Sequence, residues 1–211
     1  DQSVKSFFFF FYAKLVNMEG VITDHKKRGP DQKHDPQIIQ QLATLFRPDQ
    51  TWLSFANNHS ADFGREECFT SIEHFKAAGF HCFGTAEKPY ADIHPNLRVI
   101  TGTQWSNKPT QDLAWLDQSC EQYIDASKFN LLYPHWGYEM ECYPRYEAVK
   151  QMSLWLNCFD SVIGHHSHTP QPIQIVEKNH LKKIAAYSLG DFCFGMASKS
   201  KPGLKHYPYG L

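Results

Sequence analysis

The sequence has no pair of cysteines with the CxxC spacing that zinc ribbons and thiol redox motifs use. Its six cysteines are instead far apart along the 211 residues: Cys68, Cys82, Cys120, Cys142, Cys158 and Cys193. We expect them to be buried free thiols, because an unreactive cysteine behaves as a small apolar side chain. The cysteines therefore give no reason to expect a zinc ribbon or a redox site.

The sequence also lacks an excess of charge of either sign. It has 21 Lys and Arg against 22 Asp and Glu, a formal net charge of -1, and a pI near 6.9. Such a balance gives no general electrostatic attraction to nucleic acid or to an anionic membrane. We therefore expect no nucleic-acid partner, and we expect any anionic partner to be held by a local site.

Long apolar runs are missing as well. The longest begins at Phe7 and reaches Val16, but Lys5 and Lys14 flank or interrupt it, so it is too short to span a bilayer. It does not have the layout of a signal peptide with a cleavage site. No internal repeat or linker divides the sequence, so we expect residues 1–211 to form a single domain, and the compartment stays open.

Short apolar segments alternate with amphipathic ones along the chain. The spacing of apolar residues predicts helices at residues 36–46, 64–78, 110–125 and 144–158. We expect residues 24–35 and 199–209 to be exposed loops. Runs of strand length and composition occupy residues 13–18, 51–56, 80–83, 98–101, 129–133, 161–164, 173–176 and 184–189. The order of these segments predicts an α/β fold.

Polar residues follow several of these strands where each strand ends. "NNHSADFG" follows residue 56, "PHWGYE" follows residue 133, and "GHHSH" follows residue 163. A fourth strand runs into "LVNMEG", which adds Glu19. Loops beyond the carboxyl ends of strands form the binding crevice of open α/β sheets. Imidazole, carboxamide and carboxylate groups gathered there would suit Zn, Mn, Fe or Ni rather than calcium.

Each of these features has a simpler interpretation when it is taken alone. His135, next to Trp136, has the setting of a hydrogen-bonded packing histidine, and Glu19 that of a salt-bridged or helix-capping carboxylate. Asn57 and Asn58 are a common turn pair, and "HHSH" can be an incidental polar loop. Their joint occurrence at successive strand ends is what favours the metal-site hypothesis.

The motifs "LVNMEGVIT", "FANNHSADFG", "HWGYE", "VIGHHSHTPQ" and "YSLGDFCF" stand in the order and approximate spacing of a known family. In this respect the chain resembles the CapA-type poly-γ-glutamate capsule-biosynthesis proteins, which are similar to calcineurin-like metallophosphoesterases. The resemblance covers about residues 13–194. It implies a four-layer αββα sandwich, a two-metal centre at the strand ends, and a link to a polymer of the cell envelope.

Transferred residue by residue, the resemblance implies the following metal ligands: Glu19, Asn58, His135, His166 and His168. Glu19 would stand where the superfamily has a metal-bridging Asp, and His166 and His168 would match its H-x-H motif. The resemblance thus implies two divalent transition metal ions, such as Mn, Fe or Zn. His165 would be a neighbour in the pocket.

The resemblance also places His59 as a catalytic or positioning group. Its second ring nitrogen, if a carboxylate such as Asp62 holds it, would let the imidazole protonate a leaving oxygen. Two cations roughly 3.5 to 4 Å apart can bind both oxygens of an in-line displacement. Asp191 would be an outer or substrate-side group, and Glu139 and Glu141 are candidates to orient His135. Tyr138 and Tyr143, like Trp136, can line a groove or pack in the core.

The family's upstream Gly-Asp motif, which supplies a ligand of the first metal, does not precede "NMEG" in this sequence, and we expect the last family strand to be cut at "PYGL". We therefore expect a domain without the first and last family strands, with an exposed sheet edge or core face.

Two function classes remain open. One is a metal-dependent hydrolase of a phosphate ester or a polymer amide bond, and the other is a non-catalytic polymer-binding or assembly component among other capsule-synthesis components. A mononuclear zinc hydrolase using His135, the "HHSH" pair and Glu19 as base is a third interpretation.

Overall fold

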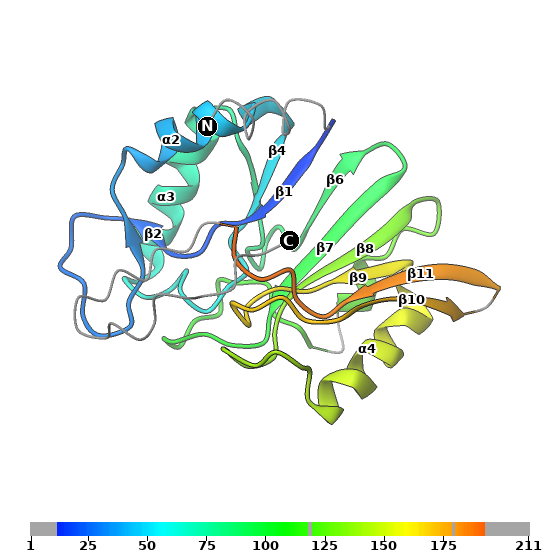
Figure 1. The fold of residues 1–211 in the computed structure, drawn as a ribbon. Helices are drawn as coiled ribbons and strands as arrows, with labels where there is room; N and C mark the ends of the chain where they lie inside the picture. The colour runs from blue at the N-terminus through cyan, green and yellow to red at the C-terminus, as the bar shows by residue number, and fades with distance from the viewer. Residues whose placement is uncertain (1–11, 118–119, 179, 193–211) are drawn as a thin grey trace.

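The structure is a computed structural model that describes residues 12–117, 120–178 and 180–192 (Figure 1). The phenylalanine run at residues 7–11, Cys193 and the loop expected at 199–209 lie outside these ranges. The main elements of the described chain are two sheets and three α-helices. This mixture confirms the α/β class that the alternation of segments predicts.

The larger sheet has six strands in the order β10-β11-β9-β8-β7-β6. Its centre is parallel, because β8 pairs in parallel with both β7 and β9, and β9 with β11. The two outer pairs, β6 with β7 and β10 with β11, are antiparallel. The strands are β6 (Tyr90–His94), β7 (Leu97–Thr103), β8 (Phe129–His135), β9 (Ser161–Ile163), β10 (Ile173–Lys178) and β11 (Leu181–Ala186).

The smaller sheet is fully parallel, in the order β1-β4-β5. It comprises β1 (Lys14–Asn17), β4 (Thr51–Ser54) and β5 (His81–Phe83). A two-stranded parallel ladder, β2 (Val21–Ile22) with β3 (Lys33–His34), follows β1. The helices are α2 (Ile38–Leu45), α3 (Arg65–Ala77) and α4 (Tyr146–Cys158), together with the 3-10 turns η1 (Pro48–Gln50) and η2 (Cys120–Tyr123).

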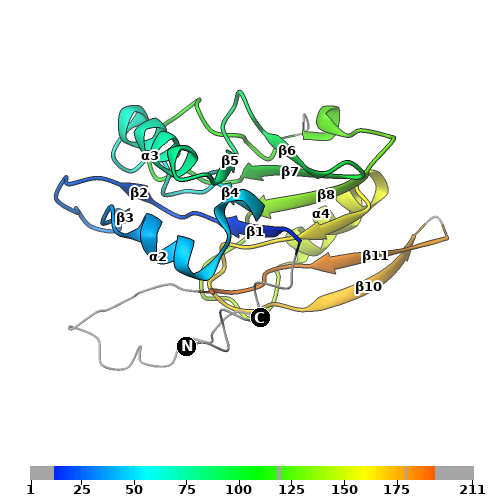
Figure 2. The same cartoon turned by 90° about the horizontal axis from the view of Figure 1, so that it is seen from above.

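Three apolar clusters hold these elements together. Figure 2 shows the arrangement of the elements, with α3 near β5 and α4 near β9. Phe83 of β5 packs with Val99 and Tyr133 of the larger sheet, which joins the inner faces of the two sheets. Phe75 of α3 belongs to a second cluster with residues of β4 and β5. In the third, Trp155 of α4 packs with residues of β7, β8 and β9. Burial of these aromatic side chains is the main stabilising term, because each removes a large apolar area from water.

Most predicted segments are present, but the helix predicted at residues 110–125 is wrong, since η2 is the only helical turn among the residues of this stretch that the structure describes. The backbone of this stretch makes its hydrogen bonds with other elements. Ala114 N–H donates to Gly84 O at 3.0 Å, and Leu116 N–H donates to Thr103 O at 3.0 Å. A helix would need those donors for its own carbonyls, so the apolar spacing of three and four reflects packing of an extended segment.

Other sequence predictions need smaller corrections. The sequence pattern does not indicate β6, and β11 begins at Leu181, before the predicted start at residue 184. In the loop predicted at residues 24–35, Asp31 is buried and β3 occupies two positions. The cysteines of the described chain are free, and Cys68, Cys82 and Cys120 are buried, but Cys142 and Cys158 are exposed. Burial raises the pKa of Cys68 to about 11 and that of Cys82 to about 12, which makes both thiols unreactive.

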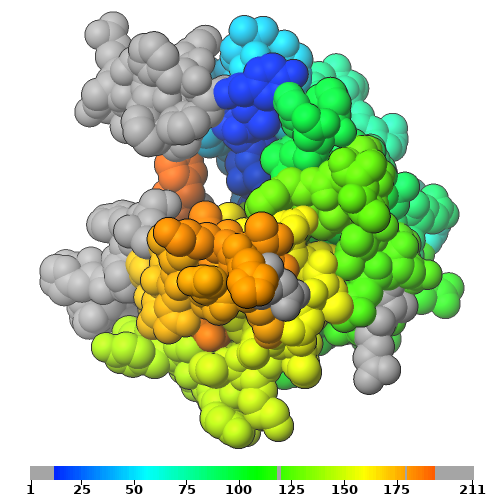
Figure 3. Space-filling view, turned by 90° about the vertical axis from the view of Figure 1, so that its right-hand side faces the viewer, coloured from blue at the N-terminus to red at the C-terminus, as the bar shows by residue number. Residues whose placement is uncertain are grey.

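The hairpin of β10 and β11 presents apolar side chains to solvent (Figure 3). Ile175 is 74% exposed and its cross-strand partner Ile184 is 45% exposed. Among the described strands, β10 and β1 each lie at the edge of a sheet. The expectation that the first and last family strands are missing stays a prediction.

Gly164 sets the path of the chain from β9 into the "HHSH" loop. A methyl group added at this position would overlap Trp136 Nε1 and Tyr187 O, which are themselves joined by a hydrogen bond of 3.0 Å. Neither atom can withdraw easily, because Trp136 is buried in the core beneath the site. The loop is thus built on a position that has no room for a side chain.

We predict that Gly164→Ala lowers the free energy of unfolding by about 1–3 kcal/mol, the usual cost of overpacking. Urea denaturation followed by tryptophan fluorescence measures this change. Gly137→Ala is the matched control, because an added methyl group there meets no atom within 4 Å, although its φ of 84° adds some backbone strain. A loss at Gly164 no larger than that at Gly137 would contradict the packing argument.

Candidate metal centre

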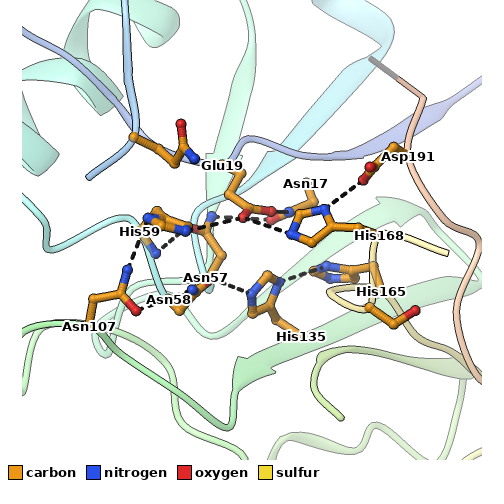
Figure 4. Close-up of polar contacts among 12 residues, drawn as sticks. Asn17, Glu19, Asn57, Asn58, His59, Asn107, His135, His165, His168 and Asp191 are labelled. Atoms are coloured by element: carbon orange, nitrogen blue, oxygen red, sulfur yellow. Dashed lines mark hydrogen bonds and ion pairs between the residues drawn. The ribbon is translucent and has the colours of Figure 1, made fainter. Parts of the chain in front are cut away.

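The carboxyl ends of four parallel strands meet at one place (Figure 4). Asn17 and Glu19 follow β1, and Asn57, Asn58 and His59 follow β4. His135 ends β8, and the four residues from His165 to His168 follow β9. The sequence predicts seven site residues, and Glu19 is partly buried. The other six are buried: Asn58, His59, Asp62, His135, His166 and His168.

Asn58, His135 and His165 form a hydrogen-bonded row. Asn58 Oδ1 lies 2.8 Å from His135 Nε2, and His135 Nδ1 lies 2.9 Å from His165 Nδ1. Burial, with the neighbouring His166 and His165, holds the pKa of His135 well below its usual value. Burial and the nearby His166 lower the pKa of His165 to about 3. Both rings are therefore neutral near pH 7, which is the form in which imidazole binds metals.

His166 and His168 are held in unusual backbone conformations. Their φ angles are 107° and 57°, values that side chains other than glycine adopt rarely. Burial and the nearby His168 lower the pKa of His166 to about 3, so this ring too is neutral. One donor atom each from Glu139, His166 and His168 lies within 4.8 Å of the others. Backbone strain of this kind persists where the surroundings fix it, and it is concentrated at functional sites.

Glu19 is the carboxylate that faces this group of rings. Its Oε2 accepts a hydrogen bond of 3.0 Å from Asn17 Nδ2. Its Oε1 lies 3.8 Å from His59 Nε2 and 3.9 Å from His168 Nε2, too far for hydrogen bonds. Burial raises the pKa of Glu19, and the nearby His168 and His59 oppose this shift. A buried carboxylate with one uncommitted oxygen is a strong candidate ligand for a cation.

Three buried polar atoms of the described site have no hydrogen-bond partner: Glu19 Oε1, His165 Nε2 and His166 Nδ1. Such atoms are uncommon in folded proteins, and each needs an explanation. Two donors on one ion, each about 2.0–2.2 Å from it, can be up to about 4.4 Å apart. The 3.9 Å between Glu19 and His168 fits this limit. The donors are therefore compatible with bound transition metal.

His59 is oriented from the side away from this cluster. Asp62 Oδ2 lies 2.6 Å from His59 Nδ1 and also accepts a 2.8 Å hydrogen bond from Gln32 N–H. Asn107 Nδ2 donates to Asp62 Oδ1 at 3.2 Å, and it lies 3.0 Å from His59 Nδ1. Because an ionised carboxylate only accepts, the proton of a neutral His59 belongs on Nδ1. His59 Nε2 is then directed toward Glu19.

The carboxylate contacts predicted around the histidines are only partly as expected. Asp191 Oδ1 lies 2.9 Å from His168 Nδ1, so it orients this ring. Burial lowers the pKa of His168, but this hydrogen bond and the charge of Glu19 outweigh burial and raise it overall. The prediction that Glu139 or Glu141 orients His135 is wrong, because His135 Nε2 contacts Asn58 and His135 Nδ1 contacts His165. Glu141 pairs instead with Arg145, at 2.5 Å.

Several residues of the site were missed from the sequence. Asn107 lies between β7 and η2, and its amide joins Asn58, His59 and Asp62. The sequence indicates Glu139 only as a partner for His135, yet one of its carboxylate oxygens lies within 4.8 Å of ring nitrogens of His166 and His168. No pattern in the sequence indicates Asn107, whereas Glu139 belongs to the "HWGYE" segment. Of the aromatic candidates, Trp136 packs in the core, and Tyr138 and Tyr143 are exposed.

The fold and this cluster define an α/β protein with a histidine-rich cluster at its strand ends. The family model of the bacterial capsule synthesis protein PGA_cap matches residues 11–107 and 94–196. The chain therefore belongs to the bacterial capsule synthesis protein family. The confirmed family is the one that the ordered motifs indicate.

Two relatives extend this comparison. The capsule biosynthesis protein CapA of Bacillus anthracis is 26% identical over 170 residues, which cover 68% of this chain. The chain spans only 40% of the length of that relative. A crystal structure of a hypothetical protein from Thermus thermophilus superposes with a TM-score of 0.50 over 90% of this chain and 69% of that one. At 12% identity, it supports the fold alone. No helix among the described residues is long and apolar enough to cross a bilayer.

We predict that Asp62→Asn disturbs His59 before it disturbs the fold. An amide can offer either an oxygen or an N–H to His59 Nδ1, so the preference for a proton on Nδ1 is lost. Long-range proton–nitrogen NMR correlations of ¹⁵N-histidine-labelled protein report the tautomer directly. Asp31→Asn is the control, because Asp31 is also buried but its carboxylate bonds to the backbone of Arg28. An unchanged His59 tautomer in Asp62→Asn would contradict the role given to Asp62.

Proposed function

We propose that the chain is a metal-dependent hydrolase of phosphate ester or polymer amide bonds, with a metallophosphoesterase-like dinuclear site. The observation that carries this proposal is that two of the proposed ligands, Glu19 and His166, each have a buried donor atom without a hydrogen-bond partner in the described chain. An unpaired buried polar atom costs about 1–3 kcal/mol. Bound cations would offset that cost at several atoms together, whereas no protein group of the described chain does so.

The proposed ligands divide into two groups according to their neighbours. Asn58 Oδ1 and His135 Nε2, which are 2.8 Å apart, would serve one ion together with His166, whose ring centroid lies 4.3 Å from that of His135. His168 would serve the other ion. Glu19 would be shared between the two ions, as the position of the superfamily's bridging Asp implies. Its Oε1 lies 3.9 Å from His168 Nε2. Glu139 is a further carboxylate within reach of His166 and His168.

When bound, two divalent transition metal ions such as Mn, Fe or Zn would supply Lewis acidity to the oxygens of the scissile group. The protein's own residues would do the rest. Asp62 and Asn107 hold the ring of His59 so that its Nε2 faces Glu19. When the ring carries a proton on both nitrogens, Nε2 can give its proton to a leaving oxygen or nitrogen, and the ring keeps the proton on Nδ1. Asp191 holds the ring of His168 in one orientation.

The finer description of the fold is part of the same proposal. Helices α2 and α3 flank the smaller sheet, the two sheets pack through Phe83, Val99 and Tyr133, and α4 packs on the larger sheet. This order supports a four-layer αββα sandwich of the calcineurin-like metallophosphoesterase type. The relative named as a capsule biosynthesis protein supports an anionic polymer as the substrate, other capsule-synthesis components as partners, and a place at the bacterial envelope.

One observation favours a second candidate function, a non-catalytic polymer-binding or assembly component. Of the five proposed ligands, only Glu19 carries a negative charge, and burial raises its pKa. Two dications held by so few negative charges would leave the pocket strongly positive, which suits the retention of a polyanion. This candidate predicts metal and polymer binding without turnover. A mononuclear zinc hydrolase would instead bind one ion per chain.

Metal content per chain is the first test, measured by elemental mass spectrometry on protein purified without chelator. We predict two transition metal ions per chain, and a loss of about one or both in His168→Ala with little change in the far-ultraviolet circular dichroism. His74→Ala is the matched control, because His74 is an exposed histidine on α3. Full metal content in His168→Ala would reject the assignment. A single ion in the unaltered chain would favour the mononuclear alternative.

Turnover separates the hydrolase from the binding component. We predict that His59→Ala keeps its metal and loses about 10²- to 10⁴-fold in the rate of hydrolysis, the usual contribution of a general acid. Bis(4-nitrophenyl) phosphate tests phosphate ester hydrolysis, and a γ-linked glutamate oligomer tests amide hydrolysis. Equal losses of metal in His59→Ala and His168→Ala would make His59 a ligand. Absence of hydrolysis in the metal-loaded chain would favour the binding component.

A further inference from the structure

A groove of about 750 Å³ opens beside the His59 end of the candidate metal centre. It is bounded by the chain that enters α3 and by the segment that follows Asn107. Apart from Ala61, Gly64 and Pro109, the residues around it carry polar or charged side chains. The lining residues are Ala61, Asp62, Gly64, Arg65, Lys108, Pro109, Thr110, Gln111 and Asp112.

The groove and the metal centre share residues. Asp62 lines the groove and also holds His59 Nδ1, at 2.6 Å. Asn107 N–H donates to Asn58 O at 3.0 Å, so Lys108 follows directly after a residue that is fixed to the site. Figure 4 shows His59 and Asn107 at one end of the cluster, and His168 and Asp191 at the other. A general acid lies on the side of the leaving group. The groove is therefore where the leaving part of a substrate would extend.

The charges around the groove are mostly compensated, with one exception. Arg65 forms an ion pair with Asp112, and its guanidinium lies over the ring of Phe69. The side chain of Asp62 is fully buried and faces His59 and Gln32 N–H. Lys108 is exposed, and its ammonium group makes no ion pair or hydrogen bond with the described residues. The groove thus presents to solvent one ammonium group that has no ion-pair partner among the described residues, whereas the carboxylate of Asp62 is fully buried.

We propose that this groove binds an anionic group on the leaving part of the substrate, and that Lys108 determines this specificity. The inference rests on the proposed function, because His59 marks the leaving-group side only if it acts as the general acid. A polar lining with one uncompensated ammonium group disfavours an apolar leaving group, which would desolvate that charge. The carboxylates of a polyglutamate chain and the phosphates of a poly(glycerol phosphate) chain share the required chemistry.

Binding of short oligomers tests the proposal without requiring turnover. The probes are fluorescein-labelled γ-linked hexaglutamate, a labelled hexamer of glycerol phosphate, and γ-linked hexaglutamine as the uncharged control, each followed by fluorescence anisotropy. We expect Lys108→Ala to weaken the binding of an anionic probe about three- to tenfold, the range for one exposed charged contact. Lys108→Glu should weaken it further, and Lys108→Arg should restore it. The anionic probe whose affinity depends more on Lys108 shows whether the groove prefers carboxylates or phosphates on the substrate.

Lys182→Ala is the matched control, because Lys182 is an exposed lysine of β11, on the larger sheet, and does not line the groove. Its affinity for both probes should equal that of the unaltered chain. Equal affinities of Lys108→Ala and Lys182→Ala would overturn the proposal, as would equally tight binding of hexaglutamine. Metal content and hydrolysis are measured on the same preparations. If binding depends on Lys108 but the chain holds no metal, the hydrolase function fails and an anion-binding groove stands.

Discussion

The candidate site depends on one constraint of chain geometry, the parallel course of β1, β4, β8 and β9. Within each sheet, parallel strands end at the same edge, β1 with β4 in the smaller sheet and β8 with β9 in the larger one. Packing between the two sheets, through the cluster that contains Phe83 and Tyr133, brings the residues after these strands together. Asn58 and His135 are 77 positions apart and yet lie within hydrogen-bonding distance. The central strands of the larger sheet are largely buried, and polar residues beyond their ends form the cluster. Substitutions in the strands would therefore act on the site indirectly, by moving these ends.

The same geometry explains what could be predicted from the sequence. Buried parallel strands are short apolar runs with polar residues after them, and this pattern is visible without a structure, as in "GHHSH" after β9. The contact of His59 with Asp62 was also foreseeable, because the two residues are three positions apart in a turn. Residues 110–125 mislead for the opposite reason. Their apolar side chains pack on neighbouring strands as an extended segment, and periodicity alone cannot distinguish that arrangement from a helix.

Side-chain partners far apart in the sequence could not be predicted. Asn107 reaches the site from a loop after β7, because Asn107 N–H bonds to Asn58 O and its amide reaches Asp62. Nothing in the local sequence indicates this contact. The partner of His135 shows the same limit. Glu139 and Glu141 are near in sequence, but the chain turns at Gly137, where φ is 84°, and His165 from the next strand fills the place instead.

The energetics of the pocket connect its strain with its proposed chemistry. Positive φ angles at His166 and His168, and unpaired atoms on Glu19 and His166, each reduce the stability of the metal-free chain. These costs fall on residues that a transition metal would bind, and on few others in the described chain. The positive charge of bound ions would also reach the groove at the His59 end, where Lys108 adds a further charge. An anionic polymer would then experience attraction along the whole path from the groove to the rings of His135 and His166.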